Sequence, residues 1–248
     1  MAGTDGLAGR APRNPFTRIV STAVAAGLLA GLVLTAVQTV QIVPTILQAE
    51  TYEDAAPAAA APVAHAHEHA HESASEPAHE HAGWKPENGT ERTSFTVLAN
   101  VSMGVAYALL LCAALTVAGV RPTLRQGLMW GAAGYAVFFM APSLGLPPEL
   151  PGTSAAPLRE RQLWWALTAL STAGGLALLA FGHGRVRALA GFVLLAAPQM
   201  IGAPQPLVHT SSAPPELQHA FVVASALANA AFWLAVGGFS SYFFKKFE

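Results

Sequence analysis

The chain has 248 residues, of which 53% are hydrophobic and 11% are charged, and its formal net charge is −1. Soluble globular domains carry roughly one quarter charged residues. This chain therefore has too few charges to cover a water-facing surface, and it lacks the basic surface that nucleic-acid binding needs. Its single cysteine, Cys112, excludes an intramolecular disulfide and any metal site built on paired cysteines.

Six apolar runs follow one another along the chain and predict an all-α fold, a polytopic membrane protein with a six-helix transmembrane bundle. A helix needs about 20 apolar residues to cross a bilayer core of about 30 Å. One run nearly reaches that length and another, residues 186–201, falls short, so five spans plus one short or re-entrant helix stay the alternative. The runs cover residues 19–43, 94–118, 124–142, 162–181, 186–201 and 218–240.

The positive charges predict the orientation of the bundle, because Lys and Arg near helix ends favour the cytoplasm. With six spans and the N-terminus inside, nine of the 13 Lys and Arg residues fall on the inner side. We therefore expect a bacterial inner (plasma) membrane protein with both termini in the cytoplasm. The segments are then a cytoplasmic tail (1–18), the first transmembrane helix (19–43), an extracytoplasmic His/Glu-rich loop (44–93), the remaining transmembrane helices (94–240) and a cytoplasmic C-terminal tail (241–248).

The predicted outer loop carries six of the nine histidines, in the stretch AHAHEHAHESASEPAHEHA. Neutral imidazole binds Co, Ni, Cu and Zn ions, and nearby carboxylates offset their charge. Because most imidazoles are neutral at pH 7, we expect a disordered loop of exchangeable metal sites. A disordered spacer with incidental metal affinity is the alternative. The candidate ligands are His65, His67, His69, His71, His79, His81, Glu68 and Glu72.

Two further sets of polar residues are candidates for a metal path. Burying an amide in lipid without a partner costs about a few kcal/mol, so the amides within the spans should face the bundle interior. Hydrogen bonds that join helices explain these amides as well as a ligand path does, and both interpretations stay open. The intramembrane set is Gln38, Gln41, Asn100, Gln199 and Asn229, and the set at the outer mouth of the path is Glu149, His209, Glu216 and His219.

Similar features at three places suggest a repeat of helical hairpins. Each helix predicted to run outward starts after an arginine and meets a proline near its outer end, at Pro44, Pro142 and Pro198. If the repeat is real, substrate would bind where the repeats meet, near broken helix ends. Chance resemblance between segments rich in alanine and proline is the alternative. The GLLAG stretch at residues 27–31 also offers small residues for close helix packing.

Several stretches carry a family resemblance. They are GLLAGLVLTAVQ, VPTILQAETYE, the His/Glu loop, ERTSFTVLAN, GYAVFFMAPSLGLPPELPGT and RQLWW. Through them nearly the whole chain resembles the CbtA family of predicted cobalt transporter subunits. The resemblance implies five or six helices, cobalt import for cobalamin synthesis, and a small single-helix partner subunit with a C-terminal histidine motif. It assigns no binding residue.

Two functions from different classes fit these features. The first is membrane transport of Co²⁺, with Ni²⁺ or Zn²⁺ as other candidates, in which the loop collects the ion and the bundle passes it inward. The second is an extracytoplasmic metal-binding accessory protein that buffers metal and hands it to a separate permease. We do not expect an enzyme, because the spans hold no nucleophile–base pair, and no GxxxxGK[ST] motif is present for a P-loop ATPase.

Overall fold

The structure is a computed structural model, and it describes residues 14–55 and 88–247. Across these ranges the chain forms helices, one isolated β-bridge between Thr153 and Ser211, and no strand, which confirms the all-α class. The helices are α1 (Pro15–Gln41), α2 (Val43–Ala55), α3 (Thr90–Val117), α4 (Leu124–Tyr135), the π-helix η1 (Ala136–Met140), α5 (Ala141–Ser143), α6 (Leu158–Phe181), α7 (Arg185–Ile201) and α8 (Pro215–Lys246).

Four of the described helices, α1, α3, α6 and α8, are long and apolar enough to cross a membrane. The other two predicted spans are shorter. One is the interrupted helix formed by α4, η1 and α5, and the other is α7, which has 17 residues. Large apolar side chains such as Leu167 and Leu170 of α6 are 64% and 71% exposed. Such side chains suit contact with lipid tails, so this is a membrane protein built from apolar helices.

The helix ends differ from the predicted spans at several places, and α1, α6 and α8 each begin three or four residues earlier than predicted. α2 follows α1 after Ile42 and occupies the start of the segment expected to be a loop. α3 begins at Thr90 and α8 continues to Lys246. Hydropathy marks the part of a helix that suits the bilayer core. It does not mark a helix end where polar residues extend the helix beyond that core.

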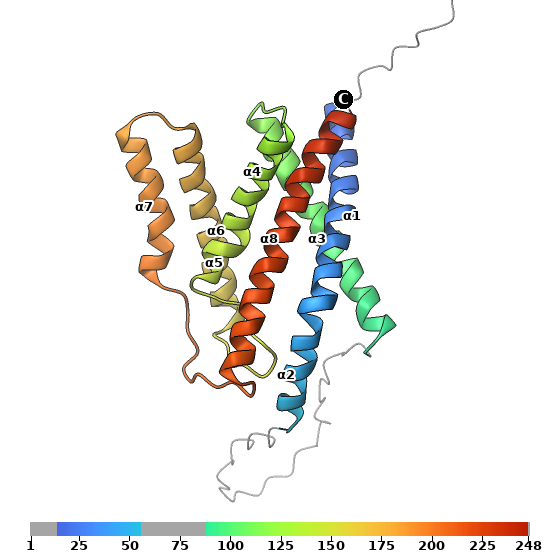
Figure 1. Cartoon of the computed structure of the whole chain (residues 1–248). Coiled ribbons are helices and arrows are strands. Elements are labelled where there is room, and N and C mark those ends of the chain that lie inside the picture. Colours follow the sequence, from blue (N-terminus) through green and yellow to red (C-terminus); the bar gives the residue numbers. More distant parts are fainter. Residues whose placement is uncertain (1–13, 56–87, 248) are drawn as a thin grey trace, which may run out of the picture.

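With α2 continuing α1, and η1 and α5 continuing α4, the successive passes of the chain run in opposite directions (Figure 1). α8 lies between α1 and α4, α3 packs on another side of α1, and α6 and α7 form a pair at the edge. The two described ends of the chain lie at the same end of the bundle, where the Arg18 guanidinium sits 4.0 Å from the centre of the Phe244 ring. This cation–π contact ties the start of α1 to the end of α8.

Glycines bring three helix pairs into close contact. Gly27 of α1 packs directly against the backbone of Val105 in α3, and Gly131 of α4 meets the backbone of α8. Between α6 and α7, a Cβ atom on Gly175 would lie 2.8 Å from the Gly191 carbonyl oxygen. Helix backbones approach this closely in membranes where small residues occupy the interface. The packing predicted for the GLLAG stretch is therefore confirmed.

An aromatic cluster holds the interrupted helix at the centre of the molecule. Phe138 of η1 stacks on Trp233 of α8 with ring centroids 5.4 Å apart, and the Tyr107 ring of α3 lies 5.1 Å from Phe138. Trp165 of α6 lies 6.2 Å from the same ring. Through Phe138, η1 contacts α3, α6 and α8 at once.

Candidate functional site

The histidine-rich segment lies outside the described residues, so the eight loop ligands between His65 and His81 stay a prediction. Within residues 14–55 and 88–247, no group of three or more His, Cys, Asp or Glu side chains lies close enough together to hold a metal ion. A metal path through the described part of the chain would have to use amide, hydroxyl and backbone carbonyl oxygens as well.

The four predicted mouth residues lie at one end of the bundle but do not form one cluster. Glu149 Oε2 accepts a hydrogen bond from Arg161 Nη2 at 3.0 Å, in a half-buried ion pair between the loop before α6 and α6 itself. His209 lies in the loop before α8, and Glu216 and His219 lie on the first turns of α8. All three side chains are exposed. The structure therefore pairs Glu149 with a cation and leaves the other three at the surface.

Hydrogen bonds join the two mouth loops, residues 144–157 and 202–214. Ser154 N donates to the Thr210 carbonyl at 2.9 Å, and Thr210 N donates to Ser154 Oγ at 2.8 Å. The Gln218 side chain of α8 donates to the backbone of the first loop at 2.7 Å and accepts from it at 3.1 Å. These bonds fix both loops over the end of the bundle.

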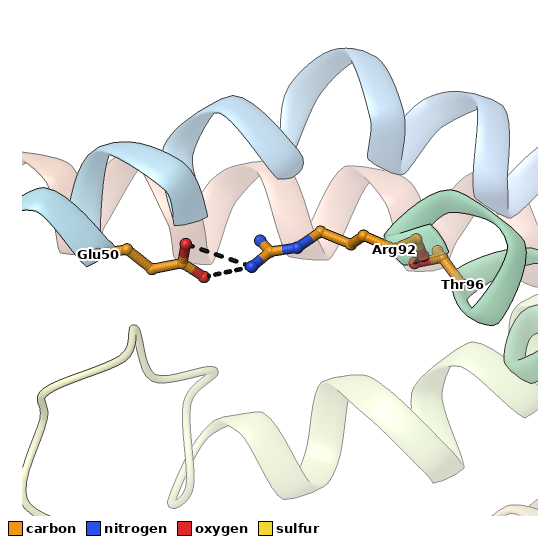
Figure 2. Close-up of polar contacts among 3 residues, drawn as sticks. All are labelled: Glu50, Arg92 and Thr96. Atoms are coloured by element: carbon orange, nitrogen blue, oxygen red, sulfur yellow. Dashed lines mark hydrogen bonds and ion pairs between the residues drawn. The ribbon is translucent and has the colours of Figure 1, made fainter. Parts of the chain in front are cut away.

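A second ion pair lies at the same end of the bundle, between Glu50 of α2 and Arg92 of α3 (Figure 2). Arg92 Nη2 donates to Glu50 Oε1 at 2.9 Å and to Oε2 at 3.3 Å, and the Arg92 carbonyl accepts from Thr96 Oγ1 at 2.8 Å. Sequence analysis did not single out this pair. The two residues are 42 positions apart, on either side of the histidine-rich segment, and no spacing rule connects them.

Asn100 of α3 is the centre of a buried polar contact between α1 and α3. Its side chain is 6% exposed, and its Nδ2 donates to Gln38 Oε1 at 2.6 Å and to Thr35 Oγ1 at 3.0 Å. Two predicted residues are thus brought together. Thr35 was not predicted, because a threonine in a helix can bond the carbonyl four residues earlier and then gives no sign of a partner on another helix. The Thr35 hydroxyl indeed donates to the Gly31 carbonyl at 2.9 Å. A threonine bonded in this way needs no second helix.

The other three predicted amides do not join this contact. Gln41 is exposed at the end of α1. Asn229 Nδ2 donates to the Ser225 carbonyl within α8 at 3.0 Å. Gln199 Nε2 of α7 donates to the Ala141 carbonyl of α5 at 2.9 Å, so it joins two helices.

Polar side chains continue along α3 from the Asn100 contact to the end of the bundle. Arg92, Thr96 and Asn100 are spaced four residues apart, so they share one face of α3. Arg92 contacts α2 and Asn100 contacts α1, while the next position on that face, Gly104, lies at the close glycine contact with α1. We call Arg92, Thr96 and Asn100 the α3 polar line. It runs from the mouth end to the middle of the bundle.

Two prolines, Pro142 and Pro198, each remove a backbone hydrogen bond from a helix, and side chains of neighbouring helices bond carbonyls close to both. Proline has no N–H, so the carbonyl four residues earlier loses its helix bond. In α7, Pro198 cannot donate to the Leu194 carbonyl. Ser171 Oγ of α6 donates to that carbonyl instead, at 2.6 Å. Beside Pro142, Gln199 bonds the Ala141 carbonyl. Neighbouring side chains commonly make broken helices tolerable in membranes.

Comparison with known proteins gives a family match. The model of a family described as probable cobalt transporter subunit (CbtA) matches residues 16–245 of the chain. Neither the curated proteins nor the solved structures gave a match. The matched range contains the α3 polar line, the two helix segments that hold Pro142 and Pro198, and the histidine-rich segment.

Proposed function

The chain belongs to the probable cobalt transporter subunit family, and from this premise we propose that it is the membrane subunit of a transporter that takes up Co²⁺ for cobalamin synthesis. The observation that carries the proposal is the family match over residues 16–245, which covers nearly all of the four candidate membrane helices. A family of transporter subunits, together with helices that suit a bilayer, favours carriage of an ion through the membrane.

The proposed topology has six passes in the bacterial inner membrane, with both termini in the cytoplasm. The alternating helix directions and the contact between Arg18 and Phe244 support an even number of passes. The same end of the bundle carries most of the described positive charges, as the cytoplasmic side of a membrane protein does. These are Arg18, Arg121, Arg125, Arg185, Arg187, Lys245 and Lys246.

The α3 polar line gives the proposal a route from the outer end into the bundle. Asn100, Gln38 and Thr35 supply amide and hydroxyl oxygens at its inner end. A divalent cation that enters a cell with a membrane potential of about 100 mV, negative inside, gains roughly 4.6 kcal/mol from the field. Uptake along this route therefore needs no nucleotide hydrolysis by the chain itself.

In this proposal the histidine-rich segment collects metal and does not choose it. Affinities of nitrogen and oxygen sites rise from cobalt through nickel to copper and fall at zinc. The six imidazoles between His65 and His81 would therefore also bind Ni²⁺ and Zn²⁺, and selectivity for Co²⁺ has to arise in the bundle or in a partner. The proposed partner is a small single-helix subunit that carries histidines.

One observation favours a second function. Within the described ranges no three-ligand group is present, so the strongest metal ligands of the chain are concentrated in the histidine-rich segment. A protein that only buffers metal outside the cell and hands it to a separate permease would need no more than that segment and a membrane anchor.

Labelled-cobalt uptake into cells separates the two functions. The variants are a loop with all six histidines between His65 and His81 changed to alanine, Asn100→Leu in the α3 polar line, and Asn229→Leu as a matched control within α8. A transporter loses uptake with Asn100→Leu, keeps it with Asn229→Leu, and keeps it at high cobalt without the loop histidines. Cobalt bound only at the cell surface, and lost entirely with those histidines, would leave the buffering protein as the correct function.

A further inference from the structure

Three polar side chains on α6 are buried without a partner. Trp164 is 8% exposed, Thr168 0% and Thr172 3%, and within the described residues their Nε1 and Oγ1 atoms have no hydrogen-bond partner. Six other helix threonines, Thr35, Thr39, Thr45, Thr93, Thr96 and Thr116, each donate to the carbonyl four residues earlier, whereas Thr22 of α1 is buried without a partner, as Thr168 and Thr172 are. Single unpartnered hydroxyls are also buried on α1 (Thr22) and α8 (Ser240), but among the described helices α6 carries three such side chains together.

The helix geometry shows where these side chains point. Successive residues of an α-helix are rotated by about 100°, and residues four apart lie nearly in line. On α6, Ser171 and Gly175 face α7, while Trp165 faces Phe138 of η1. Thr168 and Thr172 lie between these two directions. Both threonines thus lie on the part of α6 between the sides that α7 and η1 cover.

Prolines alter the backbone hydrogen bonding of both helix segments that neighbour this part of α6. Because Pro142 has no N–H, it cannot bond the Phe138 carbonyl as an α-helix residue would, nor the Val137 carbonyl as a π-helix residue would. In α7, Pro198 leaves the Leu194 carbonyl without its helix bond, and Ser171 of α6 bonds that carbonyl instead. Gln199, which bonds the Ala141 carbonyl, ties the two interruptions together beside α6.

Few contacts hold the α6–α7 pair against the rest of the bundle. α7 packs mainly on α6, and α6 meets the rest chiefly through η1 and α5. Two ring contacts join α6 to the rest of the bundle. Trp165 contacts Phe138 of η1 and Phe181 contacts Trp130 of α4, each with ring centroids 6.2 Å apart. Thr168 and Thr172 lie on α6 between these two contacts, so a small separation of α6 from η1 would uncover them.

We propose that this threonine face of α6 (Trp164, Thr168 and Thr172) is an intramembrane binding site for a hydrated divalent cation, which reaches it when the α6–α7 pair separates from η1. The inference rests on the proposed function, because it names where the transported ion binds inside the bundle. Movement of one helix group against another around a site near broken helices is the usual way in which membrane transporters give alternating access.

The chemistry of the face suits a hydrated ion and not a bare one. The described spans hold no Asp or Glu at their centres to neutralise a bare cation. The water molecules around a divalent cation donate hydrogen bonds, and the hydroxyls of Thr168 and Thr172 accept them, as do backbone carbonyls. Trp164 N–H can only donate, so it binds a water molecule at the outer end of the face.

The first test replaces both hydroxyls with methyl groups. Thr168→Val with Thr172→Val keeps the side-chain shape, and removal of two unpartnered hydroxyls should leave the melting temperature unchanged or higher, while cobalt uptake falls by about tenfold. The matched Thr168→Ser and Thr172→Ser variant should keep its uptake. Thr116→Val, which removes a bonded hydroxyl on α3, is the control for loss of a helix threonine. Normal uptake by the double valine variant would overturn the inference.

A second test does not depend on transport. Thr168→Cys, in a Cys112→Ala background, is treated in membranes with a charged thiol reagent, and Leu170→Cys on the lipid-facing side of α6 is the control. Modification at 168 but not at 170, slowed by Co²⁺ and not by Mg²⁺, supports the site even if the chain takes up no cobalt alone. An unreactive thiol at 168, in a protein that transports cobalt, would contradict it.

Discussion

At the scale of single residues, the polar side chains inside the bundle were easier to find than their partners. Gln38, Asn100 and Gln199 stand out in the sequence because an amide in an apolar run needs a partner. Which amides meet depends on the rotation of each helix about its axis and on its depth. Hydropathy contains neither quantity, so it predicted neither the pairing of Asn100 with Thr35 nor the bond from Gln199 to Ala141.

Asn100 should contribute to stability because its two bonds join separate helices. Asn100→Ala removes both, and hydrogen bonds between membrane helices contribute about 0.6 kcal/mol on average and about 1.7 kcal/mol at most. We expect a loss of roughly 1 kcal/mol in the free energy of unfolding. The control is Asn229→Ala, which removes a bond within α8. Thermal unfolding in detergent measures both, and equal losses would contradict a contact between helices.

The ion pair between Glu50 and Arg92 should matter little for stability. Its side chains are 30% and 24% exposed, and partly exposed pairs contribute about 0–1 kcal/mol. Glu50→Gln should therefore lower the free energy of unfolding by less than about 1 kcal/mol, and by less still in high salt. Melting curves at low and high salt test this, with Glu53→Gln as control. A loss well above that range would mean that the pair closes the mouth end more tightly than its exposure indicates.

At the scale of elements, helix identity was predictable and helix ends and interruptions were only partly so. The apolar runs located all the long helices, while α2 was missed because VPTILQAETYEDA mixes polar and apolar residues without a clear apolar stripe. Pro142 and Pro198 marked places close to helix ends, since α5 ends at Ser143 and α7 ends at Ile201. The π-helix before Pro142 could not be predicted, because the same proline also fits a simple kink.

Two adjacent glycines of α6 should respond to alanine with opposite signs. At Gly175 a Cβ atom would lie 2.8 Å from the Gly191 carbonyl oxygen, whereas at Gly174 the nearest atom is Leu194 Cδ1 at 3.5 Å. Gly175→Ala should cost about 1–3 kcal/mol through overpacking. Gly174→Ala should be neutral or stabilising by up to about 1 kcal/mol, because alanine favours helix. Thermal unfolding of the two variants side by side checks this, and a shared sign would contradict the α6–α7 contact.

At the scale of the whole molecule, composition alone identified a helical membrane protein, because 11% charged residues cannot cover a soluble surface. The order in which the helices pack was not predictable. The suggested repeat implies that the two helices of each hairpin pack together. α1 does pack on α3, yet α7 packs on α6 and not on its hairpin partner α8, which lies between α1 and α4. When a helix is apolar on every side, its sequence shows no apolar stripe from which the neighbouring helix could be predicted.

The histidine-rich segment should change the cobalt concentration at which uptake is half-maximal and not its maximum. If the six histidines only collect metal, alanine at all six should lower uptake at limiting cobalt by several-fold and leave the rate at saturating cobalt unchanged. Initial rates over a range of cobalt concentrations measure this. The control for charge is a variant in which the glutamates of the same segment are changed to serine. A lower maximal rate would place the segment on the transport route itself.

The most direct test of the central claim is cobalt uptake by the purified protein in lipid vesicles, with and without the proposed small partner subunit. A potassium diffusion potential of about 100 mV, negative inside, provides roughly 4.6 kcal/mol for a divalent ion. We predict that labelled cobalt enters vesicles that contain the protein, that the potential accelerates entry, and that Asn100→Leu slows it. Vesicles that bind cobalt on their surface but take up no more than protein-free vesicles, with the partner present and the potential applied, would contradict the claim that this chain transports the ion.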